Sequence, residues 1–407
     1  MAPEPPPIPE LTAAPPRRPR LVVLSGEGGA QRAGADGRAL VVHVIATRSD
    51  AVKLAPVHAA LAGEPAVRQV IVHTGQHADA ALTTQIFADV GIPAPDHVLG
   101  AGGGTPGAQT ARAIDAAEEL IAELRPAVVV VAGAANSTLG VAISAARLGV
   151  PVARLEAGLR EGDFSVTEEI NRVLLDTTAD TLFAPTGPAA ARLLSEGADP
   201  ARVHVVGSTA VDALRQAARA AAERAAWRRF GVKRGSYVLV TLHRPANVDQ
   251  DERLARIVEA LAALAQDVPV IFPVHPRTRE RLRPMGDAHR LLQAGVLCAP
   301  PLGYVDFLSL QTAAGAVVTD SGTVQEETSA LGVRCYTLRT ATEREITVSH
   351  GTNVLLGDDP RDIADVQPSR AAPTPCAIPY WDGRTAARVA RALVANYALV
   401  RASAPGH

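Results

Sequence analysis

The sequence contains few aromatic residues and few cysteines. Aromatic side chains make up 3% of the 407 residues, and cysteine occurs only at Cys298, Cys335 and Cys376. Three cysteines cannot all pair, and their spacing matches no metal-binding motif, so we expect inert, buried thiols in a reducing compartment. The chain lacks an apolar run of about 18 residues and an N-terminal segment with the apolar centre of a signal peptide. We therefore expect a cytoplasmic protein without a membrane partner.

An excess of either charge sign is also absent. Lysine and arginine number 40 against 42 aspartate and glutamate, which gives a formal net charge of −2 with both signs dispersed along the chain. Nucleic-acid binding requires a basic stripe or patch, and the sequence shows none. We therefore expect small molecules or proteins as partners, and no nucleic acid.

The first 39 residues differ in composition from the rest of the chain. Residues 1–20 are rich in proline, and residues 26–38 are rich in glycine, alanine, arginine and aspartate. The stretch LVVLSGEGG at 21–29 imitates a strand followed by a phosphate-binding loop, but no apolar run follows it to form a helix. We expect residues 1–39 to be a disordered extension.

From residue 40 onward, apolar runs alternate with helical patterns. We expect strands at 40–46, 70–73, 127–131, 152–155, 181–184, 203–206, 237–241, 270–272, 316–319 and 334–338. This alternation predicts an α/β protein with two Rossmann-like, doubly wound parallel sheets facing each other across a cleft. The expected domains are residues 40–214 and 215–383, with a last helix in 384–402 that packs back on the first domain.

The segment PVARLEAGLREGDFSVTEEINR at 151–172 carries several carboxylates. Glu156 follows an apolar run at the point where a buried parallel strand delivers a side chain to the carboxyl edge of its sheet. Glycines in the next loop would let Glu156 and Glu168 converge on one substrate and divide acid and base roles. The alternative is that Glu156 caps a turn, while Glu168 and Glu169 open a solvated helix.

Arginine and histidine follow two of the expected strands. Arg48 lies where the first strand leads into a helix, so its guanidinium could hold a phosphate beside the helix N-terminus. Pairing with Asp50 at the surface is the alternative. His243 and Arg244 follow the strand at 237–241, and a histidine beside an arginine suggests an anion site, although a lone histidine is more often structural.

The turn TDSGT at 319–323 joins a strand to a helix. Its backbone N–H groups and the helix dipole could seat a diphosphate. Alternatively, Thr323 and Glu326 form an ordinary capping box. Glu326 and Glu327 could bind a ribose diol or could simply be solvated.

Taken in order, the motifs resemble those of the non-hydrolysing bacterial UDP-N-acetylglucosamine 2-epimerases. The resemblance covers about residues 41–399, and the motifs are ATRSDAVKLAP (46–56), TGQH (74–77), EAGLREGD (156–163), TEEINR (167–172), HR (243–244), PVH (273–275), TDSGTVQEE (319–327) and RTATER (339–344). The resemblance implies the GT-B fold and inversion at C2 of UDP-N-acetylglucosamine (UDP-GlcNAc). The reaction would eliminate UDP to a glycal intermediate and add it back to the other face. The resemblance further implies a homodimer that uses no cofactor and no metal.

The resemblance also implies roles for individual residues. The catalytic residues would be Glu156, Glu168, Arg172 and His243. The UDP-binding residues would be Arg48, Lys53, His243, Phe307, Ser321, Gly322, Thr323, Glu327 and Arg344. A second, activating UDP-GlcNAc would bind Gln76, His77, Arg244 and His275.

Several positions depart from the family pattern. The chain has Ala-Gly-Ala-Ala at 132–135 where the family has His-Gly-Asp-Thr, so the acidic group expected at Ala134 is missing. The loop before Thr167 is two residues shorter, Asp79 replaces a glutamine, and Thr323 replaces a glycine. Loss of an acid or base typically lowers a rate by about 10²–10⁴. The alternatives are therefore a hydrolysing or otherwise diverged nucleotide-sugar enzyme, or a catalytically idle UDP-sugar-binding protein.

Overall fold

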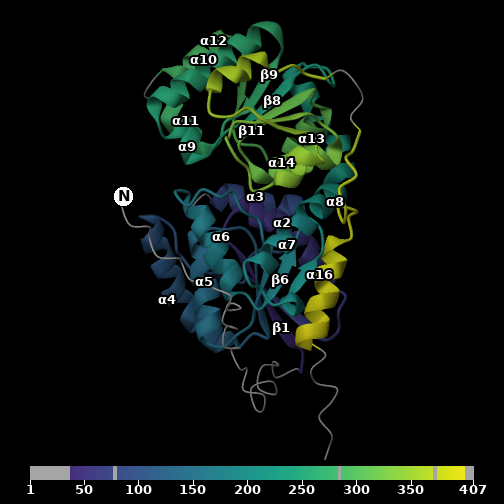
Figure 1. The fold of residues 1–407 in the computed structure, drawn as a ribbon. Coiled ribbons are helices and arrows are strands. Elements are labelled where there is room, and N and C mark those ends of the chain that lie inside the picture. Colours follow the sequence, from purple (N-terminus) through teal and green to yellow (C-terminus); the bar gives the residue numbers. More distant parts are fainter. Residues whose placement is uncertain (1–36, 77–79, 283–285, 370–373, 399–407) are drawn as a thin grey trace, which may run out of the picture.

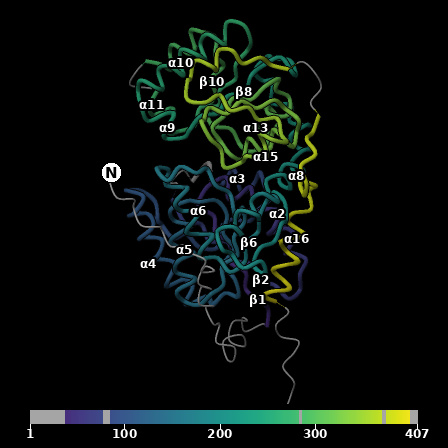
Figure 2. The backbone as a smooth tube through the Cα atoms, in the orientation of Figure 1, coloured from purple at the N-terminus to yellow at the C-terminus, as the bar shows by residue number. Residues whose placement is uncertain are grey.

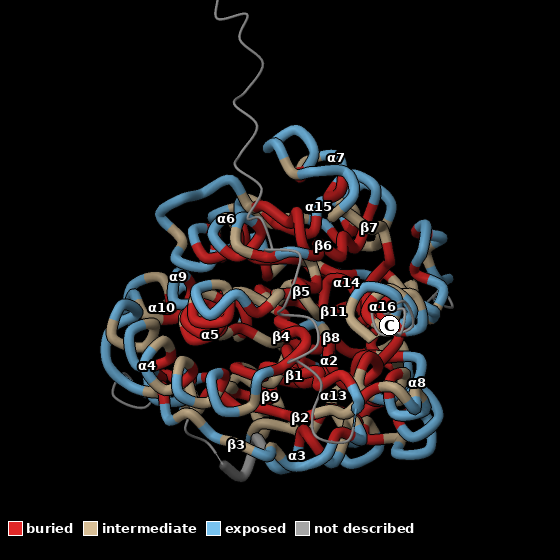
Figure 3. Tube along the Cα trace, turned by 90° about the horizontal axis from the view of Figure 1, so that it is seen from below, coloured by how far each residue is buried: buried red, intermediate tan, exposed pale blue. Residues whose placement is uncertain are grey.

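The computed structural model describes residues 37–76, 80–282, 286–369 and 374–398. Most of the expected extension at 1–39, together with His77 and Asp79, lies outside the described residues. Figure 1 shows two α/β units stacked one above the other. Figure 3 shows buried strands at the centre and exposed segments around them. In the described part of the chain, the helices all fall short of the length and apolarity that a bilayer-spanning segment requires.

The N-terminal unit is built on a seven-stranded parallel sheet with the order β3-β2-β1-β4-β5-β6-β7. Most of its strands are rich in valine, leucine and isoleucine, and β1 and β4 are completely buried. The strand order reverses between β1 and β4, which is where doubly wound sheets bind ligands. Its strands are β1 Ala39–Ile45, β2 Val67–His73, β3 His97–Val98, β4 Val128–Val131, β5 Val152–Leu155, β6 Thr181–Ala184 and β7 Val203–Val205. Its helices are α2 Arg48–Leu61, α3 Ala80–Val90, α4 Pro106–Leu124, α5 Asn136–Arg147, α6 Thr167–Thr178 and α7 Gly187–Ser195.

The C-terminal unit repeats this plan with a six-stranded parallel sheet of order β10-β9-β8-β11-β12-β13. The order reverses between β8 and β11, at the equivalent point. Its strands are β8 Val238–Thr241, β9 Val270–Pro273, β10 Leu297–Ala299, β11 Ala316–Thr319, β12 Cys335–Thr337 and β13 Asn353–Leu355. Its helices are α9 Pro245–Val248, α10 Asp251–Asp267, α11 Pro276–Leu282, α12 Asp287–Gln293, α13 Tyr304–Ala313, α14 Gly322–Leu331 and α15 Glu345–Ser349.

Two helices connect the units. Helix α8, Thr209–Arg224, packs on α2 of the N-terminal unit and on α13 and α14 of the C-terminal unit. The expected domain boundary at 214/215 lies inside this helix. Helix α16, Thr385–Leu393, packs on α2 and buries Val389 and Leu393 in the same core. Figure 2 shows this yellow segment returning along the lower unit.

The expected parallel α/β architecture is confirmed. Each of the ten strands that the sequence predicts is present within a few residues of its expected position. Strands β3, β10 and β13 were not predicted, because they are two or three residues long and only partly buried, so they produce no apolar run.

Candidate active site

The carboxyl ends of the two sheets meet where α2 and α14 begin. The hydroxyl of Ser49, in the first turn of α2, lies 2.8 Å from the hydroxyl of Thr323, in the first turn of α14. The N-termini of these two helices therefore face each other. Both follow strands at the points where strand order reverses, β1 in one sheet and β11 in the other. Helix N-termini carry partial positive charge, so this junction favours an anion.

The start of α14 excludes the capping box expected from Thr323 and Glu326. The N-cap residue is Ser321, whose side chain makes no capping hydrogen bond in the described structure. Thr323 instead bonds Ser49, and Glu326 pairs with Arg344. A carboxylate of Glu343 lies against the helix start, because a Cβ added to Gly322 would lie 2.4 Å from its Oε1. An acidic group therefore already lies beside the backbone of this turn.

At the start of α2, Asp50 and Arg48 make hydrogen bonds with different parts of the structure. Asp50 belongs to a capping box with Thr47 and accepts hydrogen bonds from the backbone N–H groups of Ala46 and Thr47. The Arg48 guanidinium instead donates to the carbonyl oxygen of Leu302, 2.9 Å away in the C-terminal unit. Arg48 therefore lies at the junction between the units.

Glu156 is held between cations from both units. Its backbone has a left-handed φ of 60°, directly after β5. Its carboxylate accepts a hydrogen bond from Lys53 Nζ at 2.7 Å and another from Arg344 at 2.5 Å. Burial by itself would raise the pKa of Glu156, but Arg344 and Lys53 outweigh it and lower the pKa to about 2. Glu156 is therefore ionised at neutral pH.

Glu326 and Glu327 are buried on α14, so the solvated alternative is wrong for both. Glu326 forms an ion pair with Arg344 at 3.1 Å, and burial raises its pKa. Glu327 accepts a hydrogen bond at 3.0 Å from the hydroxyl of Tyr304, and burial raises its pKa to about 7. Phe307 lies on α13, one turn after Tyr304, and is partly buried.

His243 is oriented by Asp320 at the carboxyl ends of β8 and β11. The Nδ1 atom of His243 lies 3.0 Å from Asp320 Oδ1, and the backbone N–H groups of His243 and Arg244 also donate to this carboxylate. Burial would raise the pKa of Asp320, but His243 and these hydrogen bonds hold it far below its usual value. The His243 ring contacts the His275 ring at a tilt of 37°, with 5.2 Å between ring centroids. The contact with Asp320 fixes Nδ1 and leaves Nε2 for another partner.

The two carboxylates at the start of α6 have different surroundings. Glu169 is buried, accepts hydrogen bonds from the backbone N–H groups of Glu161 and Gly162, and pairs with Arg172 at 2.6 Å. Glu168 is exposed. Successive residues of a helix point about 100° apart, and here Glu169 is on the buried side of α6 while Glu168 is on the exposed side. The convergence of Glu156 and Glu168 on one substrate stays a prediction.

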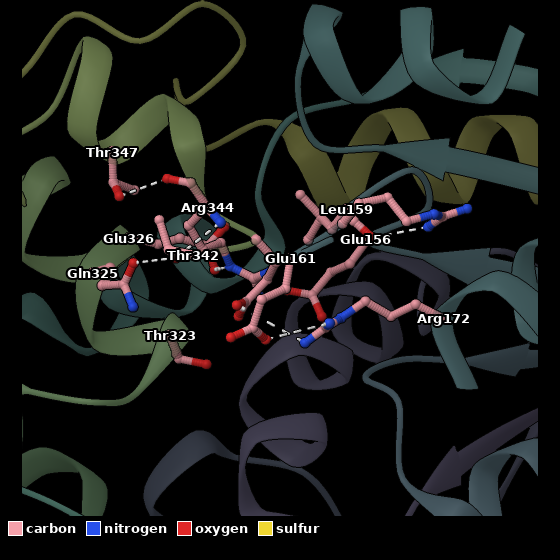
Figure 4. Close-up of polar contacts among 12 residues, drawn as sticks. Glu156, Leu159, Glu161, Arg172, Thr323, Gln325, Glu326, Thr342, Arg344 and Thr347 are labelled. Carbon is pink, nitrogen blue, oxygen red and sulfur yellow. Dashed lines mark hydrogen bonds and ion pairs between the residues drawn. The ribbon is translucent and has the colours of Figure 1, made fainter. Parts of the chain in front are cut away.

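A cluster of charged residues that the sequence did not predict as a group lies at the interface between the two units. It consists of Glu161 and Glu343 with the guanidinium groups of Arg172, Arg244 and Arg339. Figure 4 shows Glu161 between Arg172 on one side and Arg344 with Glu326 on the other. Except for Arg172 and Arg244, these residues had no signal beyond their positions inside the motifs EAGLREGD and RTATER.

The residues expected to bind an activator are only partly brought together. Arg244 and His275 both lie near His243. The side-chain oxygen of Gln76 accepts hydrogen bonds from the N–H and the hydroxyl of Ser137 at the start of α5. His77 lies outside the described residues.

Ala134 occupies a partly buried turn between β4 and α5. Its carbonyl oxygen accepts a hydrogen bond at 2.9 Å from the side-chain amide of Asn171 on α6. The neighbouring Gly133 lies against Asp50, whose Oδ1 would be 2.3 Å from a Cβ added to this glycine. Burial raises the pKa of Asp50 to about 6. A carboxyl group is therefore close to Ala134, but it is engaged in capping α2.

Comparison with known proteins identifies the family. The family model described as UDP-N-acetylglucosamine 2-epimerase matches residues 59–394. The UDP-N-acetylglucosamine 2-epimerase of Methanocaldococcus jannaschii is 40% identical over 322 residues, which cover 78% of this chain and 88% of the relative. The UDP-2,3-diacetamido-2,3-dideoxy-D-glucuronate 2-epimerase of Pseudomonas aeruginosa is 38% identical over 318 residues, again covering 78% and 88%.

Solved structures agree with this result. The crystal structure of the M. jannaschii UDP-GlcNAc 2-epimerase in complex with UDP-GlcNAc and UDP has a TM-score of 0.82 at 36% identity, covering 88% of this chain and 99% of that one. A second structure of the same epimerase gives a TM-score of 0.68 over the same shares. The family expected from the ordered motifs is confirmed, and the paired sheets form its GT-B fold. This chain belongs to the UDP-N-acetylglucosamine 2-epimerase family.

Proposed function

We propose that this protein is a UDP-N-acetylglucosamine 2-epimerase, which interconverts UDP-GlcNAc and UDP-N-acetylmannosamine by eliminating UDP and adding it back to a glycal intermediate. The observation that carries the proposal is the contact of Glu156 with Lys53 and Arg344 beside two facing helix N-termini. Elimination requires cations for the departing diphosphate and a carboxylate that accepts a proton. These groups contact each other here, and the names of the relatives support the same reaction.

Lys53 and Arg344 could serve both the departing diphosphate and the carboxylate that accepts the proton. In the structure, both neutralise Glu156. A diphosphate at the N-termini of α2 and α14 would attract the same two cations, because phosphates bind strongly to guanidinium and ammonium groups. Their transfer to the diphosphate would raise the pKa of Glu156 and make this carboxylate a stronger base. We infer that substrate binding itself activates Glu156.

Other groups at this junction complete the proposed UDP site. Ser321 and Gly322 offer backbone N–H groups at the start of α14, where the helix dipole favours an anion. Glu327 would bind the ribose, and Phe307 would flank the uracil. The proposed set consists of Arg48, Lys53, His243, Phe307, Ser321, Gly322, Thr323, Glu327 and Arg344.

The proposed partner of Glu156 in acid and base chemistry is Glu168, with Arg172 as an orienting cation. Glu168 is exposed at the start of α6. The pKa of Arg277 on α11 is raised mainly by its hydrogen bond to Asp249, and the charge of Glu168 adds to this shift. We also propose that a second nucleotide binds Gln76, His77, Arg244 and His275.

Two observations favour other products or another substrate. Ala134 supplies no acidic group where the family pattern has aspartate, which supports hydrolysis or binding without turnover as alternatives. The 38% identity to an epimerase of a diacetamido-glucuronate nucleotide supports a different UDP-sugar as the substrate. These alternatives share the proposed UDP site and differ in the products.

The deciding experiment is incubation with UDP-GlcNAc in deuterated water, followed by NMR of the products. UDP-N-acetylmannosamine that carries deuterium at C2 would support 2-epimerisation. Free UDP without a UDP-linked product would show hydrolysis. Binding without either product would show an idle nucleotide-sugar-binding protein, or one that requires another sugar, and a panel of UDP-sugars that includes UDP-uronic acids separates these two cases.

We also propose a division of labour between the two units. The N-terminal unit would act on the sugar, and the C-terminal unit would bind UDP, with a boundary near residues 214/215. We propose a homodimer in the cytoplasm, and light scattering of the purified chain would test the dimer.

A further inference from the structure

Glu161 lies among guanidinium groups that come from both units. It belongs to the loop between β5 and α6 in the N-terminal unit, and its side chain is 9% exposed. Its carboxylate lies 2.7 Å from Arg339, 3.3 Å from Arg244 and 3.8 Å from Arg172. Arg339 and Arg244 belong to the C-terminal unit, whereas Arg172 belongs to α6. Glu161 therefore connects the two units through buried charge.

The second carboxylate of the cluster cannot replace this connection. Glu343 lies 2.6 Å from Arg339 and 3.6 Å from Arg244, and all three residues belong to the C-terminal unit. Its contact with Arg172 of the N-terminal unit is longer, at 3.9 Å. Without Glu161, Arg172 would keep Glu169 and Arg339 would keep Glu343, each at 2.6 Å, but Arg244 would keep only the 3.6 Å contact with Glu343. Unbalanced charges of like sign repel strongly in a poorly solvated site, so the units would separate.

We propose that Glu161 is an interdomain latch, a positioning residue that holds the C-terminal unit against the loop that carries Glu156. The latch keeps Arg344 within reach of Glu156 before any nucleotide is bound. Arg244 is one of the residues expected to hold an activating nucleotide, and in this chain its guanidinium faces Glu161 and Glu343. Glu161 thus supplies, from within the chain, an anion that bridges the units.

The overall arrangement agrees with a latched state. The chain matches the relative's complex with UDP-GlcNAc and UDP at a TM-score of 0.82 and the second structure of that relative at 0.68. An anion that closes the units from within lowers the free energy that a ligand must supply for closure. The latch therefore concerns how the units approach each other and leaves the chemical step to Glu156.

The first test measures closure without turnover. Small-angle scattering of the ligand-free full-length protein should give a larger radius of gyration for Glu161→Gln than for the wild type. Saturating UDP should restore the wild-type value, because the proposed UDP site takes residues from both units and UDP binding would hold them together. The matched control is Glu223→Gln, which removes the same charge from an exposed pair with Arg219 on α8 and should leave the radius unchanged. Equal radii for the wild type and Glu161→Gln without ligand would overturn the latch.

The second test uses turnover and rests on the proposed function. If the closed fraction falls to about one fifth, the KM for UDP-GlcNAc rises about fivefold, because ligand binding must then also close the units. The kcat should stay within about threefold of wild type, since the saturated enzyme is closed in both cases. A fall in kcat at unchanged KM, or a lower KM, would contradict the latch. If the protein turns over none of the UDP-sugars tested, the proposed function fails, while the scattering result still decides the latch.

Discussion

Arg344 reaches Glu156 across the interface between the two units, with 2.5 Å between its guanidinium and Oε1 although the residues are 188 positions apart in the sequence. The same guanidinium also lies 3.1 Å from Glu326. Arg344 is therefore shared by a carboxylate of the proposed sugar site and a carboxylate of α14. A bound diphosphate would compete with both, which makes this arginine the point where nucleotide binding acts on the reacting carboxylate.

Replacing Glu156 with glutamine should abolish most turnover without weakening UDP binding. We expect kcat for epimerisation to fall by about 10²–10⁴, because the variant lacks a base at the sugar. UDP should bind as tightly as in the wild type or more tightly, since Lys53 and Arg344 no longer neutralise a carboxylate. Product NMR and isothermal titration calorimetry measure the two effects. Glu119→Gln, at an exposed position on α4, is the matched control. Unchanged turnover in Glu156→Gln would remove this residue from the mechanism.

The adjacent residues Glu168 and Glu169 should respond oppositely to the same substitution. Glu168→Gln should impair turnover and leave the free energy of unfolding unchanged, because this side chain is exposed. Glu169→Gln should lower the free energy of unfolding by about 2 kcal/mol, because a buried carboxylate that accepts hydrogen bonds from Arg172 and two backbone N–H groups becomes neutral. Urea unfolding and initial rates measure both. Normal turnover in Glu168→Gln would exclude it as an acid or base.

Glu327 should make the protein less stable as the pH rises. Its pKa is about 7 in the folded protein against an ordinary value of 4.5, because burial disfavours the charged form. Below pH 4.5 both states hold the proton, and between pH 4.5 and 7 only the folded state does, so stability falls across this window and is level above it. Glu327→Gln lacks this ionisation, so its stability relative to wild type should rise by up to about 3 kcal/mol from pH 4.5 to pH 7. Urea unfolding at several pH values measures the difference. A difference that does not change with pH would contradict the raised pKa.

Restoring an acidic side chain at Ala134 should increase 2-epimerisation. The turn is partly buried at the start of α5, whose N-cap residue Ala135 makes no side-chain capping hydrogen bond in the described structure, so an aspartate can be accommodated. We expect Ala134→Asp to raise kcat at least tenfold. The lower end of what an acid or base contributes is about 10², and the increase should approach this value. Ala134→Asn, which has the same shape without the charge, is the control. Equal rates in both variants would show that the chain does not need an acid at this position.

The sequence predicted the sheets well, because the longer strands are rich in apolar residues and polar residues follow them. It also predicted that Glu156 lies at the carboxyl edge of its sheet. It singled out Glu168, but it could not show that Glu169 is the residue held inside by Arg172 and two backbone N–H groups, since neighbouring residues in a helix differ in the direction that each side chain takes. The partners of Glu161 and Thr323 come from distant parts of the chain, so no local pattern announces them.

Helix α8 has a practical consequence for dissecting the molecule. Its residues Ala213, Leu214 and Ala221 share one apolar core with α2 and with Tyr304 and Leu308 of α13. A protease cut or a gene split at 214/215 would divide this helix and expose apolar core residues on each fragment. Both fragments should therefore precipitate when they are expressed separately. Fragments designed for reassembly should instead be cut after Arg224, where the left-handed Ala225 already ends the helix.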